Sequence, residues 1–426
     1  MTGASDRIGG ERPDAAARDA AKAHLARAEA AARAEPAIAA GGKPALSRVA
    51  VAGSGPAAVS LVGALVSAGH AVLLFDPDRD DATRAFDMAR RLLGHLGADA
   101  DGAAWRVSSD PAALSDAGML LDPGEIEGGV SPFAAELPPG AIFAIAAFGP
   151  ELAARAAGLP DPGRVVGLEF EPPAHATRLA EIGPAPGSAP EALAAAYALA
   201  ARLGRIPVPA GGAPLGEALM LATLAAADEM LIRGALPWEL DEAMVAFGFA
   251  TGPLEAQDLS GLARTQAARA RAGAAQQPIQ PRMVAEGRLG KAAGVGWYRY
   301  PGGGGAVVDP LIEDLIREEA YFAGIATRDW CAAEMRERIL LAQIAKAARL
   351  LESGAARRAA DLDLVSVHGL GFPAARGGLL HFADSVGPAR IVARFAALAE
   401  ADGRRPEIPP LLARLAETGG RFGAPG

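Results

Sequence analysis

The chain has 426 residues and a formal net charge of −9, and 51% of its residues are hydrophobic. This length allows two or three domains with a sizeable core, and the acidic balance argues against nucleic acid as a partner. The single cysteine, Cys331, excludes a disulfide framework and a cysteine metal cluster, and the six histidines have no ligand spacing. No metal site is therefore predicted.

The N-terminal region is predicted to be a helical arm. Residues 13–40 are rich in alanine, and Gly41-Gly42-Lys43-Pro44 follows as a stop signal. Mixed acidic and basic side chains at the start are not typical of a secretory signal, and no apolar run reaches the roughly 18 residues that a membrane span needs. We interpret residues 1–46 as an arm or linker helix, and we expect a cytoplasmic protein with no membrane span.

From Arg48 the sequence shows short apolar runs separated by helical stretches. The predicted strands cover residues 49–52, 71–75, 105–107, 118–121, 141–145 and 164–168, and a helix is predicted directly after the first strand, over residues 56–68. Strands that alternate with helices in this way are typical of a doubly wound parallel sheet. The sequence therefore predicts an α/β domain of the Rossmann type over residues 47–209.

After about residue 209 the chain is predicted to be all-α, and it contains an internal repeat. The first copy has Gly234-Ala235, Asp241, Gly248-Phe249, Gly252 and Asp258-Leu259-Ser260-Gly261; the second has Gly354-Ala355, Asp361, Gly371-Phe372, Gly377-Gly378 and Asp384-Ser385-Val386-Gly387. Each copy follows an amphipathic helical stretch, residues 221–233 and 338–352. The shared order predicts two tandem helical domains, residues 210–310 and 311–426.

The first strand-to-helix turn carries a nucleotide-binding fingerprint. Gly53-Ser54-Gly55-Pro56-Ala57-Ala58 fits G-x-G-x-x-G/A: Gly53 allows the tight turn, Gly55 lets a pyrophosphate approach the backbone, and Ala58 keeps the helix close to the strand. Asp76 ends the second strand, where a carboxylate binds the ribose 2′-hydroxyl and disfavours a 2′-phosphate. The pattern predicts NAD as cofactor; the alternative is an empty fold whose glycines only serve packing.

The helical segments carry a resemblance to a known family. Residues 246–253 (AFGFATGP) with 258–261 (DLSG), residues 287–300 (GRLGKAAGVGWYRY) and residues 367–378 (VHGLGFPAARGG) resemble the C-terminal region of the 3-hydroxyacyl-CoA dehydrogenases. The likeness covers about residues 47–395 and is to the dehydrogenase part of the multifunctional β-oxidation enzymes, without the hydratase half that precedes it there. It implies two tandem C-terminal helical domains of that family after the Rossmann domain.

The resemblance also implies an activity and ligands. The family oxidises 3-hydroxyacyl-CoA to 3-oxoacyl-CoA with NAD, so an acyl-CoA thioester is the expected partner molecule. Two helical domains in one chain could bury the faces that short family members bury between two subunits. A monomeric core is therefore expected.

The reacting groups of the family are only partly matched. The family uses a histidine base, a supporting glutamate, a serine and an asparagine; here Glu169 stands in the histidine's place and Glu181 in that of the glutamate. The serine position reads Ala146-Ala147-Phe148-Gly149, and Glu217 lies about where the asparagine would be in a chain that has no asparagine. The resemblance therefore assigns catalytic positions to Glu169 and Glu181 alone.

Three interpretations follow from this pattern. The chain binds NAD, and an acyl-CoA as well, but has weak or no activity. Alternatively, Glu169, crowded by Glu181, has its pKa raised and acts as the base on a related substrate. A third interpretation is an interaction protein without a ligand. His175, which follows Glu169 by six positions, is a further but weaker candidate for the base.

Overall fold

The computed structural model describes residues 7–34, 48–98, 100–102, 104–171, 173–274 and 277–423. The chain divides into two compact units. The sheet unit comprises Ala26–Leu215 with Gly354–Arg357, and the helical unit comprises Met1–Leu25, Gly216–Ser353 and Arg358–Gly426. The predicted stop of the first helix at residues 41–44 lies outside the described residues.

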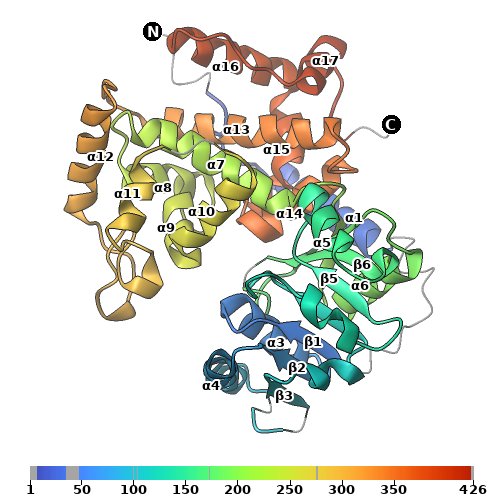
Figure 1. Ribbon diagram of the computed structural model, residues 1–426. Coiled ribbons are helices and arrows are strands. Elements are labelled where there is room, and N and C mark those ends of the chain that lie inside the picture. Colours follow the sequence, from blue (N-terminus) through green and yellow to red (C-terminus); the bar gives the residue numbers. More distant parts are fainter. Residues whose placement is uncertain are drawn as a thin grey trace. The chain divides into compact units, whose positions relative to one another are not determined.

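The sheet unit contains one eight-stranded sheet (Figure 1). Its strands are β1 (Val49–Ala52), β2 (Val72–Phe75), β3 (Trp105–Ser108), β4 (Met119–Asp122), β5 (Ile142–Ile145), β6 (Val165–Phe170), β7 (Leu179–Pro184) and β8 (Ile206–Pro209). They lie in the order β3-β2-β1-β4-β5-β6-β7-β8, and every pair is parallel except β6 with β7. The predicted doubly wound, mainly parallel sheet is confirmed; β7 and β8 are additional to the predicted strands.

Both faces of this sheet are buried. Val49 and Val51 pack into one core with residues of α3 (Pro56–Ser67), α4 (Arg79–His95) and α6 (Pro190–Arg202). Ala50 and Ala52 face the opposite core, which residues of α5 (Gly149–Ala157) and of the 3-10 helices η2 (Pro111–Asp116) and η3 (Ser131–Glu136) complete. Because neighbouring side chains of a strand point to opposite faces, a strand covered on both sides reads as an unbroken apolar run.

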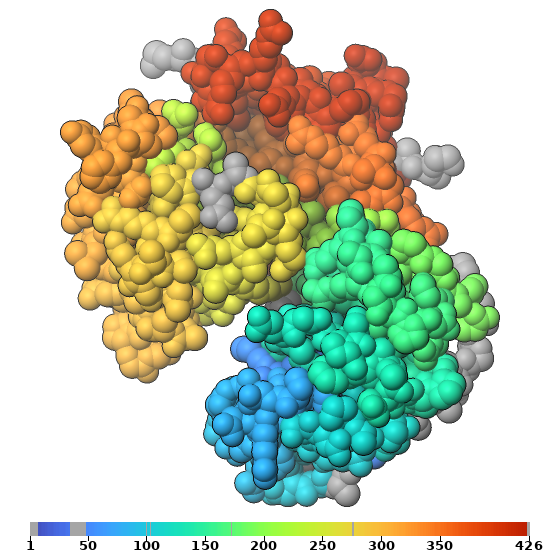
Figure 2. Space-filling view, viewed as in Figure 1, coloured from blue at the N-terminus to red at the C-terminus, as the bar shows by residue number. Residues whose placement is uncertain are grey.

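The helical unit contains most of the remaining helices. They are α7 (Leu215–Leu231), α8 (Pro237–Phe247), α9 (Pro253–Ser260), α10 (Leu262–Arg271), α11 (Ile279–Ala285), α12 (Pro310–Phe322), α13 (Ala332–Glu352), α14 (Ala359–Leu370), α15 (Leu379–Val386), α16 (Pro388–Ala401) and α17 (Pro410–Thr418). In Figure 1, α16 and α17 lie against one another, and Figure 2 shows them as a continuous exposed surface in red. The predicted all-α region is confirmed.

The internal repeat is visible in matching helix caps. In the first copy Asp241 on α8 accepts the N–H groups of Leu254 and Glu255 at the start of α9, both at 2.9 Å. In the second copy Asp363 on α14 accepts those of Leu380 (2.7 Å) and His381 (3.1 Å) at the start of α15.

The caps correct one pairing of the sequence analysis. A Cβ on Gly252 would lie 2.2 Å from that of Asp241, and one on Gly378 would lie 2.4 Å from that of Asp363, so Asp363 is the counterpart of Asp241. Asp361, which was paired with Asp241, instead binds Arg358 within its own helix turn. Each capping aspartate is the fifth residue of its helix, and the shift arises because α14 begins five positions after Gly354 whereas α8 begins three positions after Gly234.

Asp258 and Asp384 form a second matching pair. Asp258 accepts the N–H groups of Trp297 and Tyr298, both at 2.9 Å. Asp384 accepts those of Phe422 (2.8 Å) and Gly423 (3.0 Å), at nearly the same separation along the chain. In each copy, the aspartate of the Asp-x-x-Gly motif thus holds a backbone segment that returns about 40 residues later.

The N-terminal arm is bound to the helical unit. Ile8 is buried, and its N–H donates to Glu337 at 3.0 Å, while α1 (Ala15–Arg33) places His24 at 2.8 Å from Asp363. The second half of α1 belongs to the sheet unit, where Glu29 pairs with Arg178 at 3.1 Å. The predicted arm is thus a packed part of the fold over its described residues.

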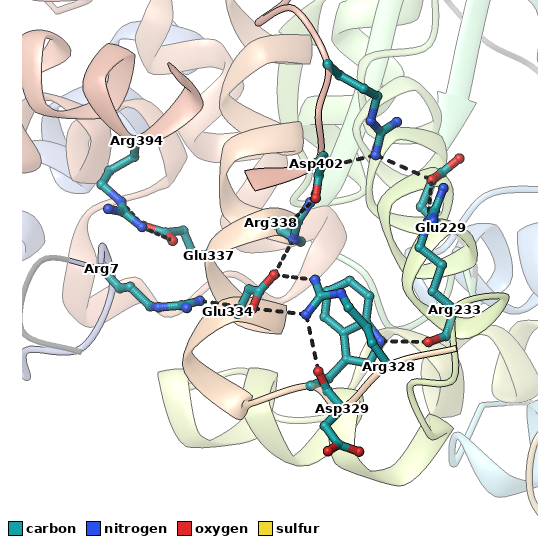
Figure 3. A network of polar contacts seen from close by, with 12 residues as sticks. Arg7, Glu229, Arg233, Arg328, Asp329, Glu334, Glu337, Arg338, Arg394 and Asp402 are labelled. Carbon is teal, nitrogen blue, oxygen red and sulfur yellow. Dashed lines mark hydrogen bonds and ion pairs between the residues drawn. The ribbon is translucent and has the colours of Figure 1, made fainter. Parts of the chain in front are cut away.

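A network of charged side chains surrounds the start of α13 (Figure 3). Glu334 accepts hydrogen bonds from Arg328 and Arg338 and lies 3.6 Å from Arg7 of the arm. Arg338 also makes two hydrogen bonds, both 2.8 Å, to the carboxylate of Asp402 beyond α16. Guanidinium and carboxylate groups of opposite charge pair at this partly buried place, so the network links the arm, α13 and the end of α16.

Candidate functional site

The glycine-rich turn connects β1 to α3. Gly53 has φ +106°, a conformation that residues with a Cβ rarely adopt, and its N–H donates to the carbonyl of Phe75 on β2 at 2.8 Å. Gly55 precedes α3, and Ala58 in its first turn is fully buried. The N–H groups at the start of α3 therefore lie at the carboxyl edge of the sheet, where nucleotides bind in folds of this kind.

These N–H groups are bound by a carboxylate of the chain itself. Glu125, three positions after the end of β4, accepts from Gly55 at 2.8 Å and Ala58 at 3.3 Å through Oε2, and from Ala57 at 2.9 Å through Oε1. A Cβ on Gly55 would lie 2.5 Å from the Oε1 atom. The carboxylate thus lies against the space that this glycine leaves open.

The arrangement shows that the turn suits an anion. Three converging N–H groups at a positive helix end stabilise negative charge, and here they bind both oxygens of one carboxylate. Burial raises the pKa of Glu125, the three N–H groups oppose that rise, and the charge of Asp76 adds to it. The donors therefore fit a phosphate of a dinucleotide, but Glu125 occupies them.

Asp76 lies where the fingerprint predicts it. It follows β2, the neighbour of β1, and is buried. Its Oδ1 atom accepts the N–H of Asp78 at 2.9 Å, and Asp78 caps α4 by accepting from Asp80 and Asp81. The turn fixes the position of the Asp76 carboxylate at the same sheet edge as Gly53.

Glu169 and Glu181 are brought together as cross-strand neighbours. The antiparallel register of β6 and β7 places Glu169 directly opposite Glu181, so both side chains point to the same face of the sheet. Glu181 is buried, and its Oε2 atom accepts the N–H of Leu215, the first residue of α7, at 2.5 Å. Since β6 runs parallel to the strands before it, Glu169 lies near the same carboxyl edge as the glycine turn, three strands away from β1.

His175 and Glu217 have other contacts. The Nδ1 atom of His175 lies 2.9 Å from the hydroxyl oxygen of Ser60 on α3, and burial followed by the charge of Arg205 lowers its pKa. Glu217 pairs with Arg271. Within the described residues no group of His, Cys, Asp and Glu side chains is arranged to hold a metal ion, and no helix is long and apolar enough to cross a membrane.

Comparison with known proteins identifies the family. Residues 132–213 match the NAD binding domain of 3-hydroxyacyl-CoA dehydrogenase, and residues 216–300 match the C-terminal domain of the same enzyme. This chain belongs to the 3-hydroxyacyl-CoA dehydrogenase family. The resemblance found in the sequence is therefore confirmed.

The similar full-length proteins are longer than the matched region. The peroxisomal bifunctional enzyme of Danio rerio is 33% identical over 284 residues, which are 61% of this chain and 39% of the relative. That of Cavia porcellus is 30% identical over 59% of this chain and 37% of the relative. The match thus spans about two fifths of the length of these family members.

Two solved structures of the family share the fold. The 3-hydroxybutyryl-CoA dehydrogenase of Escherichia coli superposes with a TM-score of 0.68 at 21% identity, covering 88% of this chain and 98% of that one. The dehydrogenase part of multifunctional enzyme 1 from C. elegans gives 0.64 at 19% identity, covering 88% and 91%. At these identities the likeness establishes the Rossmann-type sheet followed by helical C-terminal structure.

Sequence reasoning placed Gly53, Gly55, Ala58 and Asp76 at one sheet edge but did not foresee the position of Glu125. One signal was available: β4 is the neighbour of β1, so a carboxylate just after β4 lies beside the turn that follows β1.

Proposed function

We propose that this member of the 3-hydroxyacyl-CoA dehydrogenase family binds NAD and an acyl-CoA thioester, and oxidises 3-hydroxyacyl-CoA weakly or not at all. The cross-strand pair of Glu169 and Glu181 carries the proposal, because the family pattern assigns the base and its supporting carboxylate to these positions. An imidazole beside a carboxylate accepts a proton near neutral pH, whereas a second carboxylate has an ordinary pKa near 4 and is a poor base for an alcohol.

Two measurements on the purified chain test this function. NADH fluorescence titration should show saturable binding, and an assay of NADH production from 3-hydroxybutyryl-CoA and longer thioesters should show little or no turnover. Robust turnover would support the alternative, in which Glu169 acts as the base with Glu181 beside it. An absence of NADH binding would favour an interaction protein without a ligand.

Replacing the proposed base position sharpens the test. Glu169→His restores the family's histidine, and we expect little gain in turnover because the segment 146–149 and the missing asparagine leave the reacting oxygen without polar groups to hold it. Glu169→Gln is the matched control, since it removes the carboxylate without supplying an imidazole. A rise in turnover with His but not with Gln would show that the base alone limits the reaction.

The proposal also covers the cellular location and the oligomeric state of the protein. We expect a cytoplasmic location and a monomeric core, as the sequence predicts. Cell fractionation and light scattering after size-exclusion chromatography test the two expectations. A stable dimer would show that the tandem helical domains do not replace a subunit interface.

A further inference from the structure

Glu125 accepts hydrogen bonds from the same backbone N–H groups that suit a cofactor phosphate. Both oxygens of its carboxylate are bound at the start of α3, by Gly55, Ala57 and Ala58. A phosphate oxygen and a carboxylate oxygen cannot share these N–H groups, because both are negatively charged and need the same space. Dinucleotide binding and the Glu125 contact are therefore mutually exclusive.

Glu125 fills the space beside Gly55 that a pyrophosphate would need. Any Cβ at this position would lie 2.5 Å from Oε1 and 2.9 Å from Oε2 of Glu125. The same holds at Gly53, where a Cβ would lie 2.9 Å from Oε2. The two glycines that let a pyrophosphate approach the backbone here let a side chain of the protein approach it.

The segment that carries Glu125 is rich in hinge residues. Gly124, Gly128 and Gly129 all have φ between +75° and +83°. Asp122 anchors its start, accepting the N–H of Gly124 at 2.8 Å and a hydrogen bond from Arg155 at 3.3 Å. Glycines on both sides of Glu125 allow its side chain to leave the turn without moving the strand.

We propose that Glu125 is an internal competitor for the dinucleotide: its carboxylate closes the phosphate-binding turn, and a dinucleotide binds only after the segment between Asp122 and Val130 has carried it away. The proposal rests on the proposed binding of NAD. The observed affinity for the dinucleotide is then the product of two quantities: the intrinsic affinity of the open turn, and the fraction of molecules in which the turn is open.

Isothermal titration with NAD⁺ and with ADP-ribose tests the competition. Glu125→Gln and Glu125→Ala should each tighten both dissociation constants by about tenfold or more, as expected if the turn is open in about a tenth of the molecules or fewer. Glu127→Gln is the matched control, because it removes one charge from the same loop at an exposed position. Adenosine, which lacks the pyrophosphate, should bind equally to all variants.

The outcomes separate this proposal from the proposed function. Equal, measurable affinities in the wild type and both Glu125 variants would overturn the competition and leave NAD binding intact. Binding that appears only in the Glu125 variants would support the competition strongly. A failure of every variant to bind either dinucleotide probe would overturn both proposals, since an emptied turn would then still not accept a phosphate.

A measurement on the unaltered chain covers the case of a poorly folded variant. Burial raises the pKa of Glu125, so its carboxylate becomes neutral at a higher pH than an ordinary one. An open turn returns Glu125 to solvent, where its pKa is ordinary, so a proton favours the closed turn. Affinity for ADP-ribose should therefore weaken as pH falls. A flat profile would contradict the competition.

Other charged groups lie near the loop. They are Asp76, Asp122, Arg155 and Glu151, and burial raises the pKa of Asp122 as well. All four remain in Glu125→Gln, so the difference between the two profiles belongs to Glu125. A profile of the variant as steep as that of the wild type would assign the effect to these neighbours and overturn the proposal.

Discussion

The sheet unit and the helical unit each contain a helix whose first N–H groups are bound by a carboxylate from outside that helix. Glu125 binds the start of α3, and Asp241 binds the start of α9. Both contacts use the same physics, the attraction of negative charge to unpaired N–H groups at a helix N-terminus. Their surroundings differ, and so do the roles that we infer.

The Asp241 side chain is enclosed by its neighbours. It is buried, a hydroxyl of Tyr298 donates to it at 2.8 Å, and Gly252 packs against its Cβ. The second helical copy repeats the arrangement with Asp363. Among the described residues, the donors to Glu125 are three backbone N–H groups, and this half-buried side chain lies on a loop with glycine hinges. A carboxylate cap is structural where burial and a side-chain donor enclose it, and is replaceable by a ligand where they do not.

The largest effect on stability should come from removing the Asp241 carboxylate that caps α9. Asp241→Ala leaves the N–H groups of Leu254 and Glu255 and the hydroxyl of Tyr298 without their acceptor, which should lower the free energy of unfolding by about 5 kcal/mol. Urea denaturation followed by circular dichroism measures it. A loss below about 1 kcal/mol would show that water replaces the carboxylate and that the cap is no more enclosed than that of Glu125.

The next largest effect is a dependence of the free energy of unfolding on pH, which Asp241 should cause. Burial raises its pKa to about 7 from an ordinary 3.8. The folded state therefore keeps a proton that the unfolded state releases between these values, so this group's contribution to stability is greatest at low pH and is lost as pH rises towards 7. The difference is at most about 4 kcal/mol. Comparing wild type with Asp241→Asn across this range isolates it, and parallel pH profiles would contradict the assignment.

The nucleotide turn could be predicted because its signals are local. The strand, the glycines and the start of α3 lie within twenty residues, and Asp76 ends the next strand. Strand β8 was missed because Pro207 and Pro209 argue against a strand, and β7 because it follows β6 without a helix between them. Strand β7 matters for the site, since it brings Glu181 opposite Glu169.

Contacts between distant residues were the part that the sequence could not supply. Glu125 is 70 positions from Gly55, and only the place of β4 beside β1 in the sheet indicates that it reaches the turn. The choice between Asp361 and Asp363 shows the same limit at short range. Both acids lie on α14 two positions apart, and only the hydrogen bonds to α15 show which of them is the cap.

The smallest effect on stability should come from removing the charge of Glu125 at the start of α3. Glu125→Gln removes a charge from the start of α3, which by itself would cost about 1 kcal/mol, but it also removes the cost of burying a carboxylate near Asp76. We expect the free energy of unfolding to change by less than about 1 kcal/mol, while the affinity for ADP-ribose rises. A loss as large as that of Asp241→Ala would place Glu125 among the enclosed caps, because a side chain on which the fold depends that strongly could not give way to a ligand.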